Sequence, residues 1–291
     1  ERGNLIHRTL YNFYSERRRK GRVERVRLDN LSPALERLHQ IARREAQNLG
    51  LRGFFWEMEL ERMLGTKSGE ECIGLLPRFL ELEARELEAT TPAHFELSFG
   101  AYPGMGPGDP HSTPQPLLIK DPESGAQARI QGKIDRIDRT PEGKFVVLDY
   151  KTGAISDSLS AILEGRSLQL PIYLLAIEDL LGAAGMNEGV AGAYYELRDH
   201  EHCGKTGLFA NESHKGQVYR THSKMMDHEA FRAALAQTRD FALTYVRNIQ
   251  QGRFHVTTHP VDKACNHCSF QQSCRLDPRR MQLLKRQGQL S

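Results

Sequence analysis

Two predicted strands carry two carboxylates and a lysine: Asp135 lies on the first strand, and Asp149 and Lys151 lie at the end of the second. Asp149 and Lys151 share one face of an apolar strand, because side chains in a strand alternate with period two. A turn over residues 140–143 contains the Pro and Gly that turns favour, and it gives a register in which Asp135 faces Asp149. Like charges that face each other across a sheet are destabilising, and a divalent cation held by oxygen ligands offsets their repulsion.

These three residues therefore indicate a metal site of the kind that supports phosphodiester hydrolysis. Lys151 compensates the carboxylate charge and can orient an attacking hydroxide. The alternative interpretation is an ordinary edge hairpin with solvated charges.

The composition is that of a soluble globular chain: 291 residues, 39% hydrophobic and 26% charged, with a net charge of +3. That charge is too small to indicate a polyanion partner unless the basic residues cluster, as they do over residues 17–27. This basic segment is either a solvated loop or a rim that contacts phosphates. We find no signal peptide and no apolar run of the roughly 18 residues that a membrane span needs, and we expect a cytoplasmic protein without a membrane partner.

The spacing of apolar residues predicts helices before and after the strands. Ser32, Ser167 and Asp227 are the expected helix caps. An aromatic segment over residues 54–56 is expected to pack into the core. The helices are predicted over residues 3–16, from 32, and over 69–89, 167–181 and 227–252.

Four polar residues outside the hairpin have a functional interpretation only if they lie near its carboxylates. His7 lies at the start of a helix, where a packed or capping role is usual, and Glu96 lies on the polar face of a strand over residues 94–99. Gln169 and Tyr173 are four residues apart and share one helical face. They could bridge metal ligands or contact a phosphate, or they could form an ordinary buried polar pair.

Three of the five cysteines lie within a short C-terminal stretch: Cys265, Cys268 and Cys274. A turn-rich segment without a hydrophobic core needs a staple to be ordered. The odd cysteine count and the crowding favour metal binding in a reducing compartment over a disulfide framework. Zinc with His267 as fourth ligand and an iron–sulfur cluster that takes a fourth cysteine from elsewhere are both compatible with this spacing.

Taken together, the motifs make the chain resemble the C-terminal nuclease domain of bacterial helicase–nucleases of the RecB/AddB kind, within the PD-(D/E)XK nuclease superfamily. The cysteine tail extends the match to nearly the full length, whereas the phosphate-binding GxxxxGK[ST] loop of an ATPase is absent from the sequence. The matching elements occur in the family's order: Gly3-x3-His7, Glu96, GKIDRID at 132–138, VLDYKTG at 147–153 and QLPIY at 169–173.

The resemblance implies roles for individual residues. Lys151 would be the catalytic lysine, Glu96 a further acidic residue of the site, and Gln169 and Tyr173 residues that support the site or contact DNA. The implied metal is Mg²⁺, or Mn²⁺ in vitro. Its implied ligands are His7, Asp135, Asp149 and the backbone carbonyl of Tyr150.

The resemblance also implies an α/β fold with a restriction-endonuclease-like core, a mixed central sheet flanked by helices. We expect a helical section over residues 1–91 that belongs to the nuclease domain, a nuclease core over 92–252 and a cysteine-rich tail over 253–291. In AddB-type tails, four cysteines hold a [4Fe–4S] cluster, and the fourth precedes the His-bearing helix. Because this chain begins at Glu1 rather than Met, we expect a fragment whose fourth cysteine, and therefore whose cluster, belongs to the full-length protein.

The expected function is metal-dependent DNA cleavage, exonucleolytic on single strands supplied by a helicase domain or subunit, in double-strand-break repair and recombination. One alternative is a stand-alone nuclease of the same superfamily. Another is a catalytically silent structural subunit that binds DNA, although the retained set of Asp135, Asp149 and Lys151 speaks against it. A zinc-stapled DNA-binding module leaves the carboxylate hairpin unexplained.

Overall fold

The computed structural model describes residues 1–68, 71–85, 90–100, 108–122, 125–155, 159–211 and 225–253, and the single residues Ser269, Ser273, Asp277 and Leu283. The chain divides into two compact units, Glu1–Thr244 and Tyr245–Ser291. The three cysteines of the predicted staple, Cys265, Cys268 and Cys274, lie outside the described residues. None of the described helices is long and apolar enough to cross a membrane.

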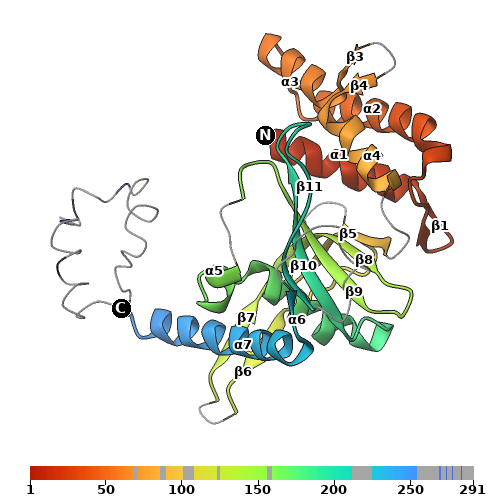
Figure 1. The fold of residues 1–291 in the computed structure, drawn as a ribbon. Coiled ribbons are helices and arrows are strands. Elements are labelled where there is room, and N and C mark those ends of the chain that lie inside the picture. The colour runs from red at the N-terminus through yellow and green to blue at the C-terminus, as the bar shows by residue number, and fades with distance from the viewer. Residues whose placement is uncertain are drawn as a thin grey trace. The chain divides into compact units, whose positions relative to one another are not determined.

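A mixed sheet forms the centre of the first unit (Figure 1), with the strand order β12-β11-β10-β9-β8-β5. Strands β5, β8 and β9 pair antiparallel, β9 and β10 pair parallel, and β10 and β11 pair antiparallel. The prediction of a mixed sheet flanked by helices is confirmed. The strands of the sheet are β5 (Thr91–Phe99), β8 (Gly132–Arg139), β9 (Phe145–Lys151), β10 (Gly189–Leu197), β11 (Cys203–Asn211) and β12 (Met225–Met226).

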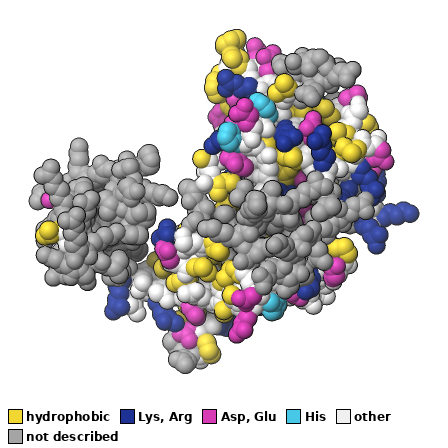
Figure 2. Space-filling model, viewed as in Figure 1, with side chains coloured by type: hydrophobic (Ala, Val, Ile, Leu, Met, Phe, Trp, Pro, Cys, Tyr) yellow, Lys and Arg dark blue, Asp and Glu magenta, His cyan; other side chains and the backbone are white. Residues whose placement is uncertain are grey.

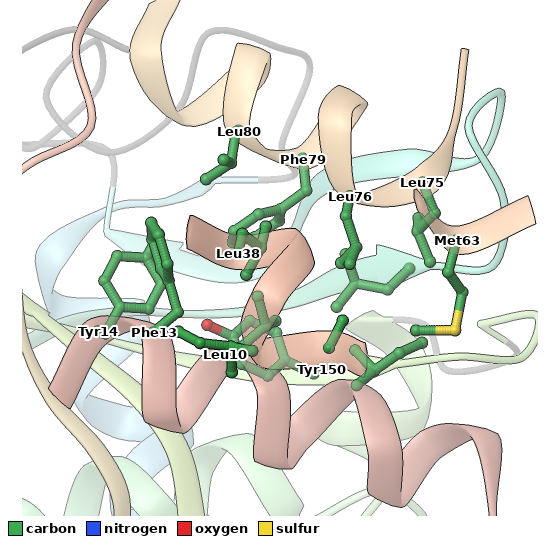
Figure 3. Close-up of a cluster of buried hydrophobic side chains, with 14 of the residues drawn as sticks. Leu10, Phe13, Tyr14, Leu38, Met63, Leu75, Leu76, Phe79, Leu80 and Tyr150 are labelled. Atoms are coloured by element: carbon green, nitrogen blue, oxygen red, sulfur yellow. The ribbon is translucent and has the colours of Figure 1, made fainter. Parts of the chain in front are cut away.

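The helical section packs on one face of this sheet. Leu10 and Phe13 from the first helix meet Leu38 and Phe79 from two others and the ring of Tyr150 from β9 (Figure 3), and all five side chains are buried. This core fixes the position of the first helix, which carries His7. The section contains α1 (Arg2–Glu16), α2 (Leu31–Asn48), α3 (Phe54–Leu64) and α4 (Leu75–Arg85).

Helix α6 (Gln169–Leu181) contacts β9 and β10. It approaches closely because β10 offers a glycine at the contact: a Cβ on Gly192 would lie 3.0 Å from Cβ of Leu170. The close approach brings the first residue of α6, Gln169, to the end of β9.

The remaining described elements are short hairpins and helices, apart from the long α7. They are β1 (Arg18–Arg19), β2 (Arg22–Val23), η1 (Leu28–Asn30), β3 (Thr66–Ser68), β4 (Glu71–Ile73), β6 (Leu117–Lys120), β7 (Gln127–Ile130), α5 (Leu159–Leu163), η2 (Gly182–Ala184) and α7 (His228–Gln250). The prediction that Asp227 caps α7 is confirmed, since its Oδ1 accepts the N–H of Ala230 at 2.8 Å.

Several sequence predictions are wrong in detail. The helix expected from residue 69 begins only at Leu75, because the preceding residues pair as the β3–β4 hairpin. Ser32 and Ser167 are not caps: α2 begins before Ser32 and α6 two residues after Ser167. Phe54 and Phe55 are exposed at 76% and 70%, because α3 buries only its C-terminal end.

Candidate active site

The β8–β9 hairpin has the register that its turn predicts. The paired residues run from Arg139 opposite Phe145 to Arg136 opposite Leu148. One step further, where Asp135 would face Asp149, the ladder gives way to a side-chain contact, in which the Asp135 carboxylate accepts the N–H of Tyr150 at 2.7 Å. The two carboxylates therefore stand at the point where the strands cease to pair.

Asp135 belongs to a cluster that joins three elements. His7 Nδ1, on α1, lies 3.2 Å from Asp135 Oδ1 and 3.2 Å from Glu96 Oε1 on β5. The edge-to-face contact between the His7 and Tyr150 rings, 5.7 Å between centroids, orients the imidazole. Lys133 closes the cluster, with Nζ 2.6 Å from Glu96 Oε2.

A second set of contacts links Asp149 to α6. Lys151 Nζ lies 2.6 Å from Asp149 Oδ2 and donates to Gln169 Oε1 at 3.0 Å. The amide nitrogen of Gln169 donates to Asp149 Oδ1 at 2.7 Å and to the hydroxyl of Tyr173 at 3.1 Å. Gln169 thereby holds the lysine and the carboxylate in fixed relative positions.

The electrostatics join both sets into one site. Burial and the charge of Asp135 raise the pKa of Asp149 to about 6, against the opposing effect of Lys151. Burial lowers the pKa of His7, but its hydrogen bonds to Asp135 and Glu96 outweigh this and raise it to about 10. Burial raises the pKa of Tyr173 to about 12. A surplus of carboxylates therefore shapes the site, and without a metal the protonated His7 supplies a countercharge.

The donor set fits a hard divalent cation. One imidazole nitrogen and two carboxylate oxygens, from His7, Glu96 and Asp135, lie within 4.8 Å of one another. Carboxylates with one imidazole suit Mg²⁺ or Mn²⁺ better than a soft metal. A cation held by these atoms would replace the shared His7 proton, while Asp149 would contribute from the neighbouring strand.

The acidic residue on β5 has an unusual backbone conformation. Glu96 has φ of +52°, in the left-handed region that side chains other than glycine rarely adopt. Its two neighbours still pair with β8, Phe95 with Arg136 and Leu97 with Ile134. Glu96 is thus turned out of the regular pleat at the site itself, where backbone strain often serves function.

This strain gives a stability prediction. We expect Glu96→Gly to be more stable than Glu96→Ala by about 1 kcal/mol, since only glycine accepts this φ without cost. Urea unfolding of the two variants, in buffer without divalent metal, measures the difference. Equal midpoints would show that Glu96 does not carry this strain.

The structure brings together the predicted site residues that lie in the described part of the chain. His7, Glu96 and Asp135 form one set, and Asp149, Lys151, Gln169 and Tyr173 form the other. The side chain of Tyr150 packs in the helical core, so its implied role as a ligand rests on its backbone carbonyl.

Sequence analysis assigned no role to two residues of the site. Period-two alternation predicts Lys133 on the same strand face as Asp135, and the structure shows that it pairs with Glu96. Tyr194 lies on β10 beside Asp149, with its ring 4.9 Å from Lys151 Nζ in a cation–π contact. The parallel pairing of β9 with β10 was needed to find Tyr194.

Comparison with known proteins agrees with this geometry. A family model described as the PD-(D/E)XK nuclease superfamily matches residues 1–275. Similar curated proteins are each named as a subunit of an ATP-dependent helicase/deoxyribonuclease. That of Streptococcus equi subsp. zooepidemicus is 28% identical over 47% of this chain, and that of Carboxydothermus hydrogenoformans is 31% identical over 48%. That of Bacillus velezensis is 27% identical over 68% of this chain.

The matched regions cover only 14% to 16% of the length of these relatives. The family match, in contrast, covers most of the chain and includes the whole hairpin, α1 and α6. The mixed sheet flanked by helices is the restriction-endonuclease-like core that the sequence predicts. The chain belongs to the PD-(D/E)XK nuclease superfamily.

Proposed function

We propose that this chain is the DNA-cleaving domain of a helicase–nuclease and acts as a metal-dependent exonuclease on single strands during double-strand-break processing. The observation that carries the proposal is the pairing of Lys151 with Asp149 and Gln169 beside the His7–Glu96–Asp135 cluster. The names of the relatives support a DNA substrate and a helicase partner, which would reside in the same protein or in a second subunit.

The family resemblance and the contacts together support a role for each residue of the site. His7, Asp135 and Asp149, with the Tyr150 carbonyl and Glu96, would hold Mg²⁺ or Mn²⁺. The bound cation would supply Lewis-acid stabilisation of the charge that develops on the scissile phosphate. The Lys151 ammonium would position the attacking water and stabilise negative charge in the transition state.

Gln169 and Tyr173 would support this chemistry without taking part in proton transfer. The amide of Gln169 bridges Lys151 and Asp149 and so keeps the ammonium aimed at the site. Burial keeps Tyr173 protonated, since its pKa is raised to about 12, and its hydroxyl remains available as a donor to DNA.

The domain boundaries belong to the same proposal. Residues 1–91 would form part of the nuclease domain because α1 supplies His7, and residues 92–252 would form the core. Cys265, Cys268 and Cys274 would hold a [4Fe–4S] cluster together with a fourth cysteine.

The substrate assignment is tested with end-labelled single-stranded and duplex DNA of equal sequence, incubated with the chain in Mg²⁺ or EDTA. We expect Mg²⁺-dependent release of short products from single strands, with duplex DNA cut more slowly. Labels at the 5′ and 3′ ends distinguish the direction of digestion. Discrete internal cuts would contradict the exonuclease assignment and leave the nuclease assignment standing.

Metal binding has a separate readout in stability. At a metal concentration ten times its Kd, binding to the folded state alone adds about 1.4 kcal/mol to the free energy of unfolding. We expect Mn²⁺ or Mg²⁺ to raise the melting temperature of the parent chain and of Asp179→Asn, an exposed carboxylate of α6. Asp135→Asn, which keeps an oxygen for the N–H of Tyr150, should lose this rise. An undiminished rise in Asp135→Asn would place the metal elsewhere.

A further inference from the structure

A pocket of about 650 Å³ lies between the β1–β2 hairpin, the start of β5 and the β8–β9 turn. Its charged or titratable lining groups are Arg22, His94, His111 and Arg139, and none of the described residues that line it is acidic. Two pockets beside α3 and α4, in contrast, are lined by residues of both signs. The lining of the first pocket therefore suits an anion.

The β1–β2 hairpin concentrates positive charge at the rim. Lys20 and Gly21 form its two-residue turn, with φ of +49° and +78°, which is typical of a tight hairpin. The turn places Arg19 directly opposite Arg22, an arrangement that is destabilising unless an anion is near. Within the described part of the chain we find no side-chain hydrogen bond or ion pair for Arg19, Lys20 or Arg22. Figure 2 shows dark-blue Lys or Arg side chains protruding where β1 lies in Figure 1.

The base of the hairpin is fixed by a buried carboxylate. Arg18 donates to Asp109 Oδ2 at 2.7 Å and to the carbonyl of Ala93 at 3.0 Å. The same carboxylate holds two histidines of the pocket, with Asp109 Oδ1 lying 3.0 Å from His94 Nδ1 and 3.3 Å from His111 Nδ1. The Nδ1 atoms are thus occupied by Asp109, which leaves the Nε2 atoms for other partners.

His94, Asp109 and His111 also have the composition of a metal site. The Asp109 carboxylate, however, is already saturated: Oδ1 accepts the N–H of His111 at 2.9 Å, and Oδ2 contacts Arg18 and the N–H of Phe95. A cation would have to displace these donors and would stand beside the Arg18 guanidinium. The geometry favours a clamp that orients the histidines.

A buried hydroxyl at the pocket gives an independent indication of a ligand. Thr140 lines the pocket and is 5% exposed, and its Oγ1 has no hydrogen-bond partner among the described residues. A buried polar atom without a partner is costly, and native proteins rarely keep one without a reason. A rotation of the Thr140 side chain would let this hydroxyl donate to a phosphate oxygen in the pocket.

We propose that this pocket binds a phosphate of the nucleic-acid strand whose cleavage is proposed above, away from the scissile bond. Arg139 lies four residues after Asp135 on β8, a separation of roughly 13 Å along the strand. His94 lies two residues before Glu96 on β5. Strands β5 and β8 therefore carry residues of both the candidate active site and the pocket. A bound nucleic-acid strand can reach both.

The test measures binding in EDTA, so it does not depend on cleavage. Fluorescence anisotropy with a labelled single-stranded oligonucleotide compares the parent with Arg22→Gln/Arg139→Gln. We expect about tenfold weaker binding and a salt dependence shallower by about 0.7, the contribution of one phosphate on a single strand. Arg43→Gln/Arg52→Gln removes the same charge from two exposed arginines outside the pocket and should bind almost as the parent does. Equal losses in both double variants would overturn the proposal.

Thr140→Val distinguishes binding in the pocket from a general effect of positive charge, because it removes no charge. It keeps the shape and removes only the unpartnered hydroxyl, so we expect unchanged or higher melting temperature with weaker DNA binding. Unchanged DNA binding in this variant would count against the pocket.

Calorimetry with inorganic phosphate tests whether the pocket binds a small anion instead. If Arg22→Gln/Arg139→Gln weakens the binding of free phosphate but leaves the DNA affinity unchanged, the pocket is a small-anion site and the assignment to a nucleic-acid strand is overturned. A chain that cleaves no DNA but shows the predicted binding losses would refute the nuclease proposal and leave the pocket intact.

Discussion

Lys151→Met will lower the rate of DNA cleavage by about 10²- to 10³-fold, the usual effect of removing one preorganised charge from a transition state. The methionine keeps most of the side-chain volume and removes the ammonium that lies 2.6 Å from Asp149 and 3.0 Å from Gln169. Single-turnover kinetics at saturating Mg²⁺ measure the loss. Lys151→Arg will not restore the rate, because a planar guanidinium cannot replace a compact ammonium at this position.

Lys144→Met is the matched control. Lys144 belongs to the same hairpin and pairs with Glu188 at 2.9 Å, outside the site. Its replacement should leave the cleavage rate unchanged. Parent-like cleavage by Lys151→Met would remove the lysine from the chemistry and leave it as a structural partner of Asp149.

Arg136→Met will lower the free energy of unfolding by about 3–5 kcal/mol, the cost of leaving buried charges without their partner. The Arg136 side chain is 1% exposed, and its guanidinium lies 2.7 Å from Glu83 and 2.6 Å from Asp138. Burial raises the pKa of Glu83, but Arg136 and Lys205 outweigh it and lower that pKa to about 2. Methionine would therefore leave the buried carboxylates of Glu83 and Asp138 without the guanidinium, on the face of the sheet that supports the helical section.

Urea unfolding measures this loss. Arg78→Met, which breaks a solvent-exposed ion pair with Glu81 on α4, should leave the unfolding midpoint close to that of the parent. If Arg136→Met does not fold, Asp138→Asn, which keeps the shape and hydrogen-bonding oxygen, gives a smaller loss of the same sign. A midpoint unchanged in both variants would show that this buried network does not hold the helical section on the sheet.

The sequence predicts the hairpin well because its information is local. Turn residues set the register, and period-two alternation then sends Asp135 to the site and Arg136 to the core. His7 and Glu96 could be placed only by family resemblance, since no local rule brings α1 and β5 together. The positive φ of Glu96 has no sequence signal, because glutamate does not prefer it.

The errors have equally specific causes. Phe54 and Phe55 are hydrophobic enough for a core. They are exposed because α3 packs against the protein only through its C-terminal end, which the sequence does not show. Strand β11 was not predicted, because its sequence CGKTGLFAN contains two glycines and little alternation. Asp109 lies in a loop without any motif, and its contacts with Arg18, His94 and His111 exist only in the folded chain.

The most direct test compares the parent chain with Asp149→Asn on end-labelled single-stranded DNA, in Mg²⁺ and in EDTA. The amide keeps the size of the carboxylate and removes the charge that would help to hold the cation, while Asp179→Asn controls for loss of a carboxylate on the surface. We predict cleavage by the parent and the control in Mg²⁺, none in EDTA, and none by Asp149→Asn. Cleavage by Asp149→Asn at the parent rate, or cleavage that persists in EDTA, would contradict a metal-dependent nuclease site at this hairpin.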